Sequence, residues 1–349
     1  MIANDGLRRP PSTGRTSRQL DRVHAIYTAV VNSKIAALPV TAEDIAAAAS
    51  RIRDFVHRTP LLANKSIQEA IGSEVRLKCE NLQRAGAFKI RGAANALLQL
   101  TLEQRARGVV AFSSGNHAQG VALAAQMLGI PATIVMPEGA VEAKVQATRG
   151  YGATVVQADV TQATRGDVAR AIVEKTGGTL IPPFDHPHII AGAGTVGREI
   201  VAEWPEVRNV LVPLGGGGLL AGIAIAVKNH DTSIRVFGIE PAAGNDGQRS
   251  FRGGSIVRIE PPSTIADGAR TTSIGLDNFT IIKALVSDIL TVEDDELLET
   301  VKFVVYRTKL LIEPTGALGI AALMTKKVQL DGPTAVVISG GNLDLSLLC

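Results

Sequence analysis

Short apolar segments alternate with longer helical segments from Thr41 onward, and this alternation constrains the fold more than any other feature of the chain. The short segments are rich in β-branched residues, as expected of strands, and cover residues 75–79, 108–112, 131–136, 153–157, 209–214, 234–239, 288–292 and 334–339. Helices are predicted over residues 42–57, 91–106, 116–128, 139–149, 161–176, 188–204, 217–229, 276–286, 294–311 and 314–327. Strands that are buried on both faces and separated by helices form parallel sheets. We therefore expect an α/β protein in which helices cover both faces of a parallel sheet.

Length, charge and cysteine content narrow the class of protein. The chain has 349 residues, a formal net charge of +3 and 46% hydrophobic residues, which predicts two domains or one large one with a buried core. The balanced charge argues against an obligate nucleic-acid binder, and no apolar run reaches the ~20 residues of a membrane helix. The only cysteines are Cys79 and Cys349, which excludes a disulfide framework and favours a reducing, cytoplasmic setting.

Residues 1–19 differ in composition from the rest of the chain. They combine four arginines with two adjacent prolines, and no apolar core follows within this stretch, so they do not resemble a secretory signal. We expect a disordered tail, and an organelle transit peptide is the alternative because it is also arginine-rich and poor in acids. Residues 20–38 have the apolar spacing of a helix. Residues 1–38 are therefore predicted to form a tail and an extra helix.

A polar turn follows the predicted strand 108–112, at the edge where open parallel sheets bind ligands. It has the sequence SSGNH over residues 113–117 and begins the next predicted helix. The backbone N–H groups and the helix dipole at such a turn favour an anionic group. Taken alone, the motif is explained equally well by an ordinary helix cap made of serine and asparagine.

Four consecutive glycines separate the predicted strand 209–214 from the following helix: Gly215, Gly216, Gly217 and Gly218. Their N–H groups can converge on one point, which favours a phosphate-binding loop, and no Gly-Lys-Ser/Thr follows as an ATP P-loop requires. A rival interpretation uses the spacing G-x-G-x-x-A ending at Ala221, with Glu240 22 residues after Gly218. That spacing is typical of a dinucleotide site and leaves a nicotinamide-dependent dehydrogenase as an alternative.

Lys89 lies where an irregular segment becomes a helix, between Phe88 and Ile90. Shielding from water lowers the pKa of an amine, which makes this lysine a candidate for forming a Schiff base. The alternative is an ordinary surface lysine beside a helix.

Taken together, these segments resemble the fold-type II pyridoxal-phosphate enzymes of the serine/threonine dehydratase and serine racemase family. The resemblance covers residues 41–347 and is carried by six collinear segments: residues 78–97, 112–125, 213–224, 265–275, 310–323 and 336–345. It implies two open, twisted, mainly parallel sheets flanked by helices, as in tryptophan synthase beta-like proteins. It also implies a small domain, 108–185, inserted into a large pyridoxal-phosphate-binding domain made of 39–107 plus 186–349. A homodimer is a further implication.

The resemblance assigns a cofactor role to several residues. Lys89 would hold pyridoxal phosphate covalently and act as the base at the substrate Cα, while Phe88 would pack on the cofactor ring. Asn116 would bond the ring hydroxyl, Ser339 would face the pyridine nitrogen, and Glu313 matches the acidic residue below this site. The phosphate would be bound by the loop formed by Gly215, Gly216, Gly217, Gly218 and the N–H of Leu219.

The resemblance also assigns substrate residues. The substrate carboxylate would be held by the turn formed by Ser113, Ser114, Gly115, Asn116 and His117. Ser114 is the residue found in the racemase branch, where many threonine dehydratases have alanine, so it would deliver a proton to the second face of Cα. Arg270 would either bind a second substrate carboxylate, as in hydroxyaspartate ammonia-lyases, or face solvent. One departure is Ala87, because the family usually has serine or threonine before the Phe-Lys pair.

A cation site is the third implication. Glu240, Gly244 and Asp246 resemble the cation site of the racemase branch, and two carboxylates with a backbone carbonyl are suitable ligands for Mg²⁺ or Ca²⁺. The alternative is a polar turn after a strand.

The expected reaction is the dehydration of a β-hydroxy amino acid, such as L-threonine or L-serine, to a 2-oxo acid and ammonia. A neutral hydroxyl at Ser339 does not hold the pyridine nitrogen protonated, which favours a reaction in which a leaving group removes charge over one with a persistent carbanion. The alternatives within the family are an amino acid racemase and a hydroxyaspartate or phenylserine dehydratase. Outside it, a non-catalytic protein that has kept the fold is the remaining alternative to the dehydrogenase.

Overall fold

The computed structural model describes residues 38–159 and 164–348. The predicted tail and helix within residues 1–37 therefore lie outside the described residues, as do residues 160–163 at the start of the predicted helix 161–176. In the described part of the chain, no helix combines the length and the apolar character needed to span a membrane.

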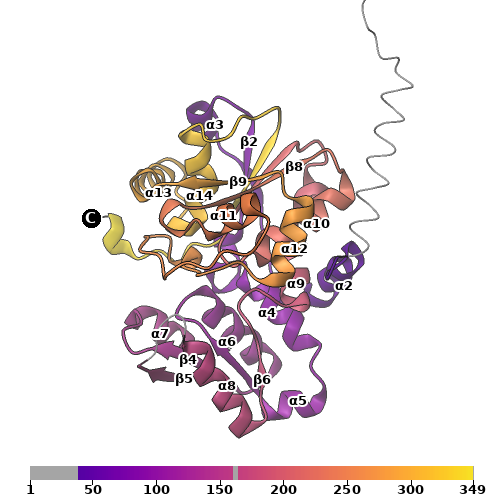
Figure 1. The fold of residues 1–349 in the computed structure, drawn as a ribbon, viewed down its shortest axis with the longest axis vertical. Coiled ribbons are helices and arrows are strands. Elements are labelled where there is room, and N and C mark those ends of the chain that lie inside the picture. The colour runs from indigo at the N-terminus through magenta and orange to yellow at the C-terminus, as the bar shows by residue number, and fades with distance from the viewer. Residues whose placement is uncertain (1–37, 160–163, 349) are drawn as a thin grey trace, which may run out of the picture. The chain divides into compact units, whose positions relative to one another are not determined.

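The strands form two sheets, and both are mainly parallel (Figure 1). The six-stranded sheet has the order β1-β2-β10-β7-β8-β9, and only β1 runs antiparallel to its neighbour. Its strands are β1 (Leu61–Ala63), β2 (Val75–Cys79), β7 (Asn209–Pro213), β8 (Arg235–Pro241), β9 (Asp288–Val292) and β10 (Thr334–Ile338). The four-stranded sheet has the order β5-β4-β3-β6 and consists of β3 (Val109–Phe112), β4 (Ala132–Pro137), β5 (Thr154–Ala158) and β6 (Thr179–Leu180). The predicted fold class is confirmed.

Helices connect the strands, and most lie where the apolar spacing predicts them (Figure 1). They are α2 (Ala42–Ile52), α3 (Lys65–Ile71), α4 (Lys89–Leu98), α5 (Leu102–Arg107), α6 (Asn116–Leu128), α7 (Glu142–Gly150), α8 (Arg165–Thr176), α9 (Pro187–Glu203), α10 (Gly218–His230), α11 (Asp246–Gly253), α12 (Leu276–Leu285), α13 (Asp294–Thr308) and α14 (Pro314–Met324). The predicted helix 91–106 is two helices, because Thr101 and Gln104 form a capping box that begins α5. The short 3₁₀ helices are η1 (Glu80–Leu82), η2 (Arg84–Gly86), η3 (Ala242–Gly244), η4 (Asp267–Ala269) and η5 (Leu345–Leu348).

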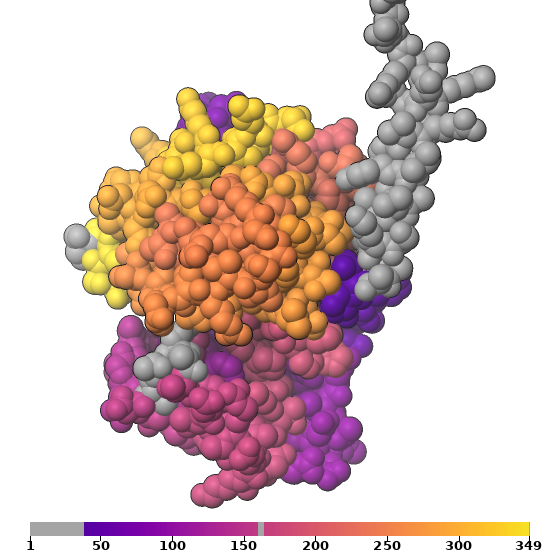
Figure 2. All heavy atoms as spheres, viewed as in Figure 1, coloured from indigo at the N-terminus to yellow at the C-terminus, as the bar shows by residue number. Residues whose placement is uncertain are grey.

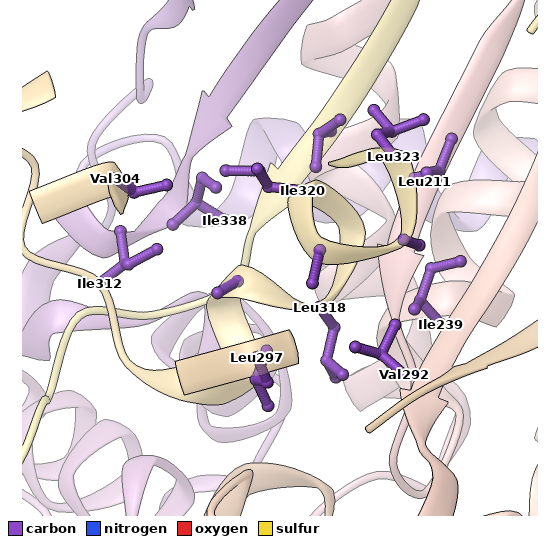
Figure 3. Close-up of a cluster of buried hydrophobic side chains, with 14 of the residues drawn as sticks. Leu211, Ile239, Val292, Leu297, Val304, Ile312, Leu318, Ile320, Leu323 and Ile338 are labelled. Atoms are coloured by element: carbon purple, nitrogen blue, oxygen red, sulfur yellow. The ribbon is translucent and has the colours of Figure 1, made fainter. Parts of the chain in front are cut away.

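One face of the six-stranded sheet is covered by α14 together with α13 (Figure 3). Leu318 and Ile320 of α14 are fully buried in a cluster with Leu211, Ile239 and Ile338 from three central strands. A helix that is apolar on every side, as α14 is, must be buried on every side. This packing fixes the carboxyl ends of β7 and β10, which precede the glycine loop and Ser339.

In the four-stranded sheet, strand β3 is buried on both faces. Val109 and Ala111 of β3 pack in a cluster that includes residues of α4 and α6, whereas the intervening Val110 packs with Val135 and Ala169 of α8. This alternation is the two-residue period of a strand between two layers of helices. In the space-filling view of Figure 2, the purple to magenta residues of the segment that carries this sheet gather in one region of the molecule.

All four strands of the second sheet fall inside residues 108–185, the segment predicted to form the small domain. The division of the chain at residues 107 and 186 stays a prediction.

A buried network of charged side chains connects β2, η1, α4 and α9. Arg91 of α4, with no exposed side-chain surface, donates to both carboxylate oxygens of Glu80 at 2.7 and 2.8 Å. It also donates to both oxygens of Glu199 at 2.7 and 2.9 Å, and Lys78 Nζ donates to Glu199 at 2.6 Å. Because Arg91 is two residues from Lys89, this network holds the helix that carries the predicted cofactor lysine.

Candidate active site

Two adjoining cavities lie beyond the carboxyl ends of the strands. The larger has a volume of about 370 Å³ and is lined by residues of both sheets' loops. The smaller has a volume of about 40 Å³ and shares Lys89, Phe184 and Ser339 with the first. Of the predicted site residues, the larger cavity is lined by Phe88, Lys89, Ser113, Ser114, Gly115, Asn116, His117, Gly216, Arg270, Glu313 and Ser339. The smaller adds Gly215, Gly217, Gly218 and Leu219.

Lys89 is the first residue of α4 and lies in both cavities. Its Nζ donates to the carbonyl of Pro183 at 2.9 Å and lies 5.0 Å from the centroid of the Phe88 ring. The backbone N–H of Phe88 donates to the Ser339 carbonyl at 3.1 Å, which fixes the lysine against the end of β10. Burial lowers the pKa of Lys89 to about 8, and the nearby Glu313 carboxylate opposes this effect. A lysine with such a pKa is partly neutral near pH 7, as a nucleophilic amine must be.

The glycine loop between β7 and α10 is packed too tightly for side chains. A Cβ added to Gly216 would lie 2.2 Å from the Phe184 ring, and one added to Gly217 would lie 2.8 Å from Ile274. Gly217 also has a φ of 98°, which glycine adopts without strain. The first N–H groups of α10 have no acceptor within the helix, so the loop presents donors and a helix dipole to the smaller cavity. A phosphate group fits these donors.

Asn116, Glu313 and Ser339 form a polar cluster beside Lys89. Asn116 Nδ2 donates to Glu313 Oε1 at 2.7 Å, and Asn342 Nδ2 donates to Asn116 Oδ1 at 2.8 Å. Burial raises the pKa of Glu313 to about 7, and the charge of Asp267 acts in the same direction. Ser339 Oγ and Glu313 Oε2 are buried and have no hydrogen-bond partner among the described residues. A buried polar atom without a hydrogen-bond partner costs free energy. The polar atoms of a ring bound in the cavity would be partners for these two oxygens.

The turn after β3 begins α6, with Gly115 at the cap position. Ser113 Oγ accepts the N–H of Gly115 at 3.2 Å, so the turn is held open toward the cavity that Ser114 also lines. The His117 ring nitrogen Nε2 lies 3.0 Å from the Ile181 carbonyl, and burial and the charge of Lys89 lower its pKa to about 3. His117 is therefore neutral, and it is the backbone of this turn that can bind an anion.

Arg270 lines the larger cavity, but its guanidinium is turned toward the backbone. Its Nε and Nη2 donate to the Thr264 carbonyl at 2.8 and 2.5 Å. The sequence did not point to three other residues at the cavity: Lys144 of α7, which forms an ion pair with Asp267, and Arg165 at the beginning of α8. Lys144 and Arg165 come from segments without a local motif, and Asp267 lies in the segment 265–275 but had no role assigned to it, so only the folded chain brings these side chains together.

Glu240, Gly244 and Asp246 lie outside both cavities, on β8, η3 and α11. The Glu240 carboxylate accepts the N–H groups of Gly247 and Gln248 at 3.2 and 2.7 Å, while Asp246 Oδ2 is buried and unpartnered in the described chain. Burial raises the pKa of Glu240 well above its ordinary value and that of Asp246 to about 7. No group of three or more His, Cys, Asp or Glu side chains suited to a metal occurs in residues 38–159 and 164–348. A cation here would be held by two carboxylates with the Gly244 carbonyl, and it stays a prediction.

Comparison with known proteins gives one consistent family. The chain matches the family model described as pyridoxal-phosphate dependent enzyme over residues 52–341. It is 50% identical over 306 residues to serine racemase of Schizosaccharomyces pombe, covering 87% of this chain and 95% of that protein. It is 48% identical over 303 residues to L-threo-3-hydroxyaspartate ammonia-lyase of Saccharomyces cerevisiae, covering 86% of this chain and 93% of the relative.

The solved structures agree with the sequence relatives. Maize serine racemase superposes with a TM-score of 0.86 at 38% identity, covering 88% of this chain and 95% of that one. The family match spans most of the chain and includes both strand ends that form the two cavities. The chain belongs to the family of pyridoxal-phosphate-dependent enzymes.

Proposed function

We propose that this protein is a dehydratase that converts a β-hydroxy amino acid, such as L-threonine or L-serine, to a 2-oxo acid and ammonia. The observation that carries the proposal is the convergence of Lys89, the glycine loop and the unpartnered Ser339 hydroxyl on two adjoining cavities. The relatives named as ammonia-lyases support it. A nicotinamide-dependent dehydrogenase finds no support in the family to which the chain belongs.

The residues present fit pyridoxal phosphate. The phosphate would be held by the N–H groups of residues 215–219, the carbonyl carbon by the Lys89 amine, and the polar ring atoms by Asn116 and Ser339. When bound, the cofactor withdraws electrons from the substrate Cα. The residues of the chain bind and orient the substrate and transfer the protons.

Each catalytic role falls to a residue at the cavity. The turn of residues 113–117 would hold the substrate carboxylate at the N-terminus of α6, which orients the Cα proton. The Lys89 amine would accept that proton, because burial lowers its pKa into the range of a useful base. The β-hydroxyl would leave as water. Hydrolysis at nitrogen then consumes one water, so the net products are a 2-oxo acid and ammonia.

Racemisation is the second candidate, and the Ser114 side chain in the cavity favours it. Inversion at Cα needs a proton donor on the face opposite Lys89, and the Ser114 hydroxyl would be that donor. We expect Ser114→Ala to lower Cα inversion of serine by at least about 100-fold while 2-oxo acid release stays within about 10-fold of wild type. Chiral chromatography and a keto-acid assay on the same samples measure the two rates.

Ser113→Ala is the matched control, since Ser113 stabilises the same turn through its bond to Gly115. This change should lower both rates together. Equal loss of both rates in Ser114→Ala would show that Ser114 only binds the carboxylate. Inversion by the wild-type enzyme without any 2-oxo acid from serine, threonine or 3-hydroxyaspartate would make the protein a racemase instead.

We also propose that Glu240, Gly244 and Asp246 bind Mg²⁺ or Ca²⁺, supported by the unpartnered oxygen of Asp246. Millimolar Mg²⁺ should then raise Tm in the wild type, and Asp246→Asn should remove that rise.

A homodimer remains a proposal drawn from the family, and a monomeric elution profile would contradict it.

A further inference from the structure

The segment between β6 and α9 reaches the candidate active site with consecutive residues. The Pro183 carbonyl accepts a hydrogen bond from Lys89 Nζ at 2.9 Å. The Phe184 ring occupies the space beside Gly216, where an added Cβ would come within 2.2 Å of it. Asp185 follows, and its side chain lines neither of the two cavities. Asp185 can therefore affect the site only through the residues that it contacts.

Asp185 caps helix α12, which begins 91 residues later in the chain. Its carboxylate accepts the backbone N–H groups of Leu276 at 2.9 Å, Asp277 at 3.1 Å and Asn278 at 3.3 Å. Gly275, which precedes the helix, has no side chain to form this cap, and a Cβ there would lie 2.2 Å from the Asp185 carboxylate carbon. A carboxylate at this position pairs the free N–H groups of the first turn and complements the helix dipole. The cap also fixes the beginning of α12 against the segment that carries Asp185.

The beginning of α12 is bonded in turn to the glycine loop. The Gly216 carbonyl accepts two hydrogen bonds, from the N–H of Gly275 at 3.1 Å and from Asn278 Nδ2 at 2.8 Å. Asn278 is fully buried, and a Cβ added to Gly217 would lie 2.9 Å from its own Cβ. In a trans peptide the carbonyl of one residue and the N–H of the next point in opposite directions within one plane. The two bonds to Gly216 therefore also fix the N–H of Gly217, which points away from α12.

We propose that Asp185 and Asn278 are positioning residues of the glycine loop, and that they set the affinity of the protein for the phosphate of pyridoxal phosphate. Asp185 holds the beginning of α12, and Asn278 joins it to the Gly216 carbonyl. A loop that is already held in one conformation loses less conformational entropy when a ligand binds, which favours the bound state. This inference rests on the proposed phosphate site at the glycine loop, and it is the same for a dehydratase and for a racemase.

The first test measures cofactor binding to the full-length chain after the cofactor has been removed. Asp185→Ala should raise the Kd of pyridoxal phosphate by about 10-fold or more, because the N–H groups at the beginning of α12 lose a charged acceptor. The Kd of pyridoxal, which has no phosphate, should stay within about 3-fold of the wild-type value, because the changed loop does not contact it. The absorbance of the ring bound to Lys89 measures both constants.

Two further variants separate the cap from the bond to the loop. Asp185→Asn should lose less affinity than Asp185→Ala, because the amide keeps one oxygen as an acceptor. Asn278→Ala removes the bond to Gly216 and should also raise the Kd of pyridoxal phosphate, by about 5-fold, with little change for pyridoxal. Combining Asp185→Ala with Asn278→Ala should cost less than the sum of the two losses, because both residues act on the same carbonyl.

Asp277→Ala is the matched control. Asp277 is an acidic residue of the same first turn, so this variant removes the same charge from the same end of α12 and keeps the Asp185 cap. Both dissociation constants should stay within about 2-fold of wild type.

The second test needs no cofactor. Hydrogen exchange, followed by mass spectrometry, compares the peptide that contains residues 214–219 with the peptide that contains β3. In the cofactor-free chain, Asp185→Ala should speed exchange in the glycine-loop peptide and leave exchange in the β3 peptide unchanged, because only the loop loses its support.

Four outcomes would overturn the inference. Equal weakening of pyridoxal phosphate and pyridoxal in Asp185→Ala would make Asp185 a residue that supports the whole cavity. A lowered Tm with unchanged binding would make it an ordinary helix cap. A loss in Asp277→Ala as large as in Asp185→Ala would assign the effect to charge alone. Equal wild-type affinity for pyridoxal phosphate and pyridoxal would overturn the proposed phosphate site together with this inference. If Asp185→Ala does not fold, Asp185→Asn and Asn278→Ala give the same comparison.

Discussion

Lys89→Ala is expected to lower 2-oxo acid release from β-hydroxy amino acids by at least about 10³-fold. The lysine has two tasks in this account, because it would bind the cofactor covalently and would accept the Cα proton. Its side chain lies in both cavities, and its lowered pKa suits both tasks. The keto-acid assay on wild type and variant, each loaded with excess pyridoxal phosphate, measures the loss.

Lys89→Arg is the control that keeps the positive charge and most of the side-chain volume. A guanidinium stays protonated and forms no Schiff base, so this variant should be as inactive as Lys89→Ala. If either variant kept more than a tenth of the wild-type rate, Lys89 would be only a positioning residue.

Arg91→Met is expected to destabilise the protein by about 3–5 kcal/mol, because it leaves the buried Glu80 carboxylate without its cationic partner and leaves Glu199 with Lys78 alone. Glu80 and Glu199 each lose two bonds from the guanidinium. Although burial alone would raise the pKa of Glu80, the Arg91 charge holds that pKa below its ordinary value. A carboxylate with a lowered folded pKa adds stability above its unfolded pKa, and this contribution is lost as pH falls through the folded pKa. The difference between wild type and variant should therefore shrink in acid.

Urea unfolding at pH 7 and at pH 3, followed by circular dichroism, measures both effects. Arg107→Met is the matched control, since Arg107 forms an exposed ion pair with Glu103 and should contribute less than about 1 kcal/mol. If Arg91→Met lowered the free energy of unfolding as little as the control does, or if its effect grew in acid, the buried network would not stabilise the fold.

The strand and helix pattern predicted most of the fold, because periodicity is a local property that the finished structure keeps. All eight predicted strands are present within a few residues of their expected ends. The short strands β1 and β6 were not predicted, since three and two residues are too few to show a period. Their pairing depends on the neighbouring strands β2 and β3 rather than on their own residues.

The candidate site also has a part that the sequence predicted and a part that it did not. Residues in motifs at strand ends, such as Ser114, Gly216 and Ser339, could be predicted because parallel strands place their carboxyl ends at one edge. The contacts that Arg165 makes with Phe112 and Asn342 with Asn116 could not be predicted, because each joins residues far apart in the sequence. The direction of a side chain is also invisible in the sequence, and Arg270 shows this: its guanidinium is bonded to the Thr264 carbonyl.

The most direct test of the account is borohydride reduction of the purified holoenzyme, followed by proteolysis and mass spectrometry. Reduction makes a lysine–cofactor linkage permanent, so the modified residue can be located in a peptide. We expect loss of the yellow absorbance and a single phosphopyridoxyl group on the peptide that contains Lys89. Modification of another lysine, such as Lys144 in the same cavity, or no modification at all, would contradict the claim that Lys89 binds the cofactor.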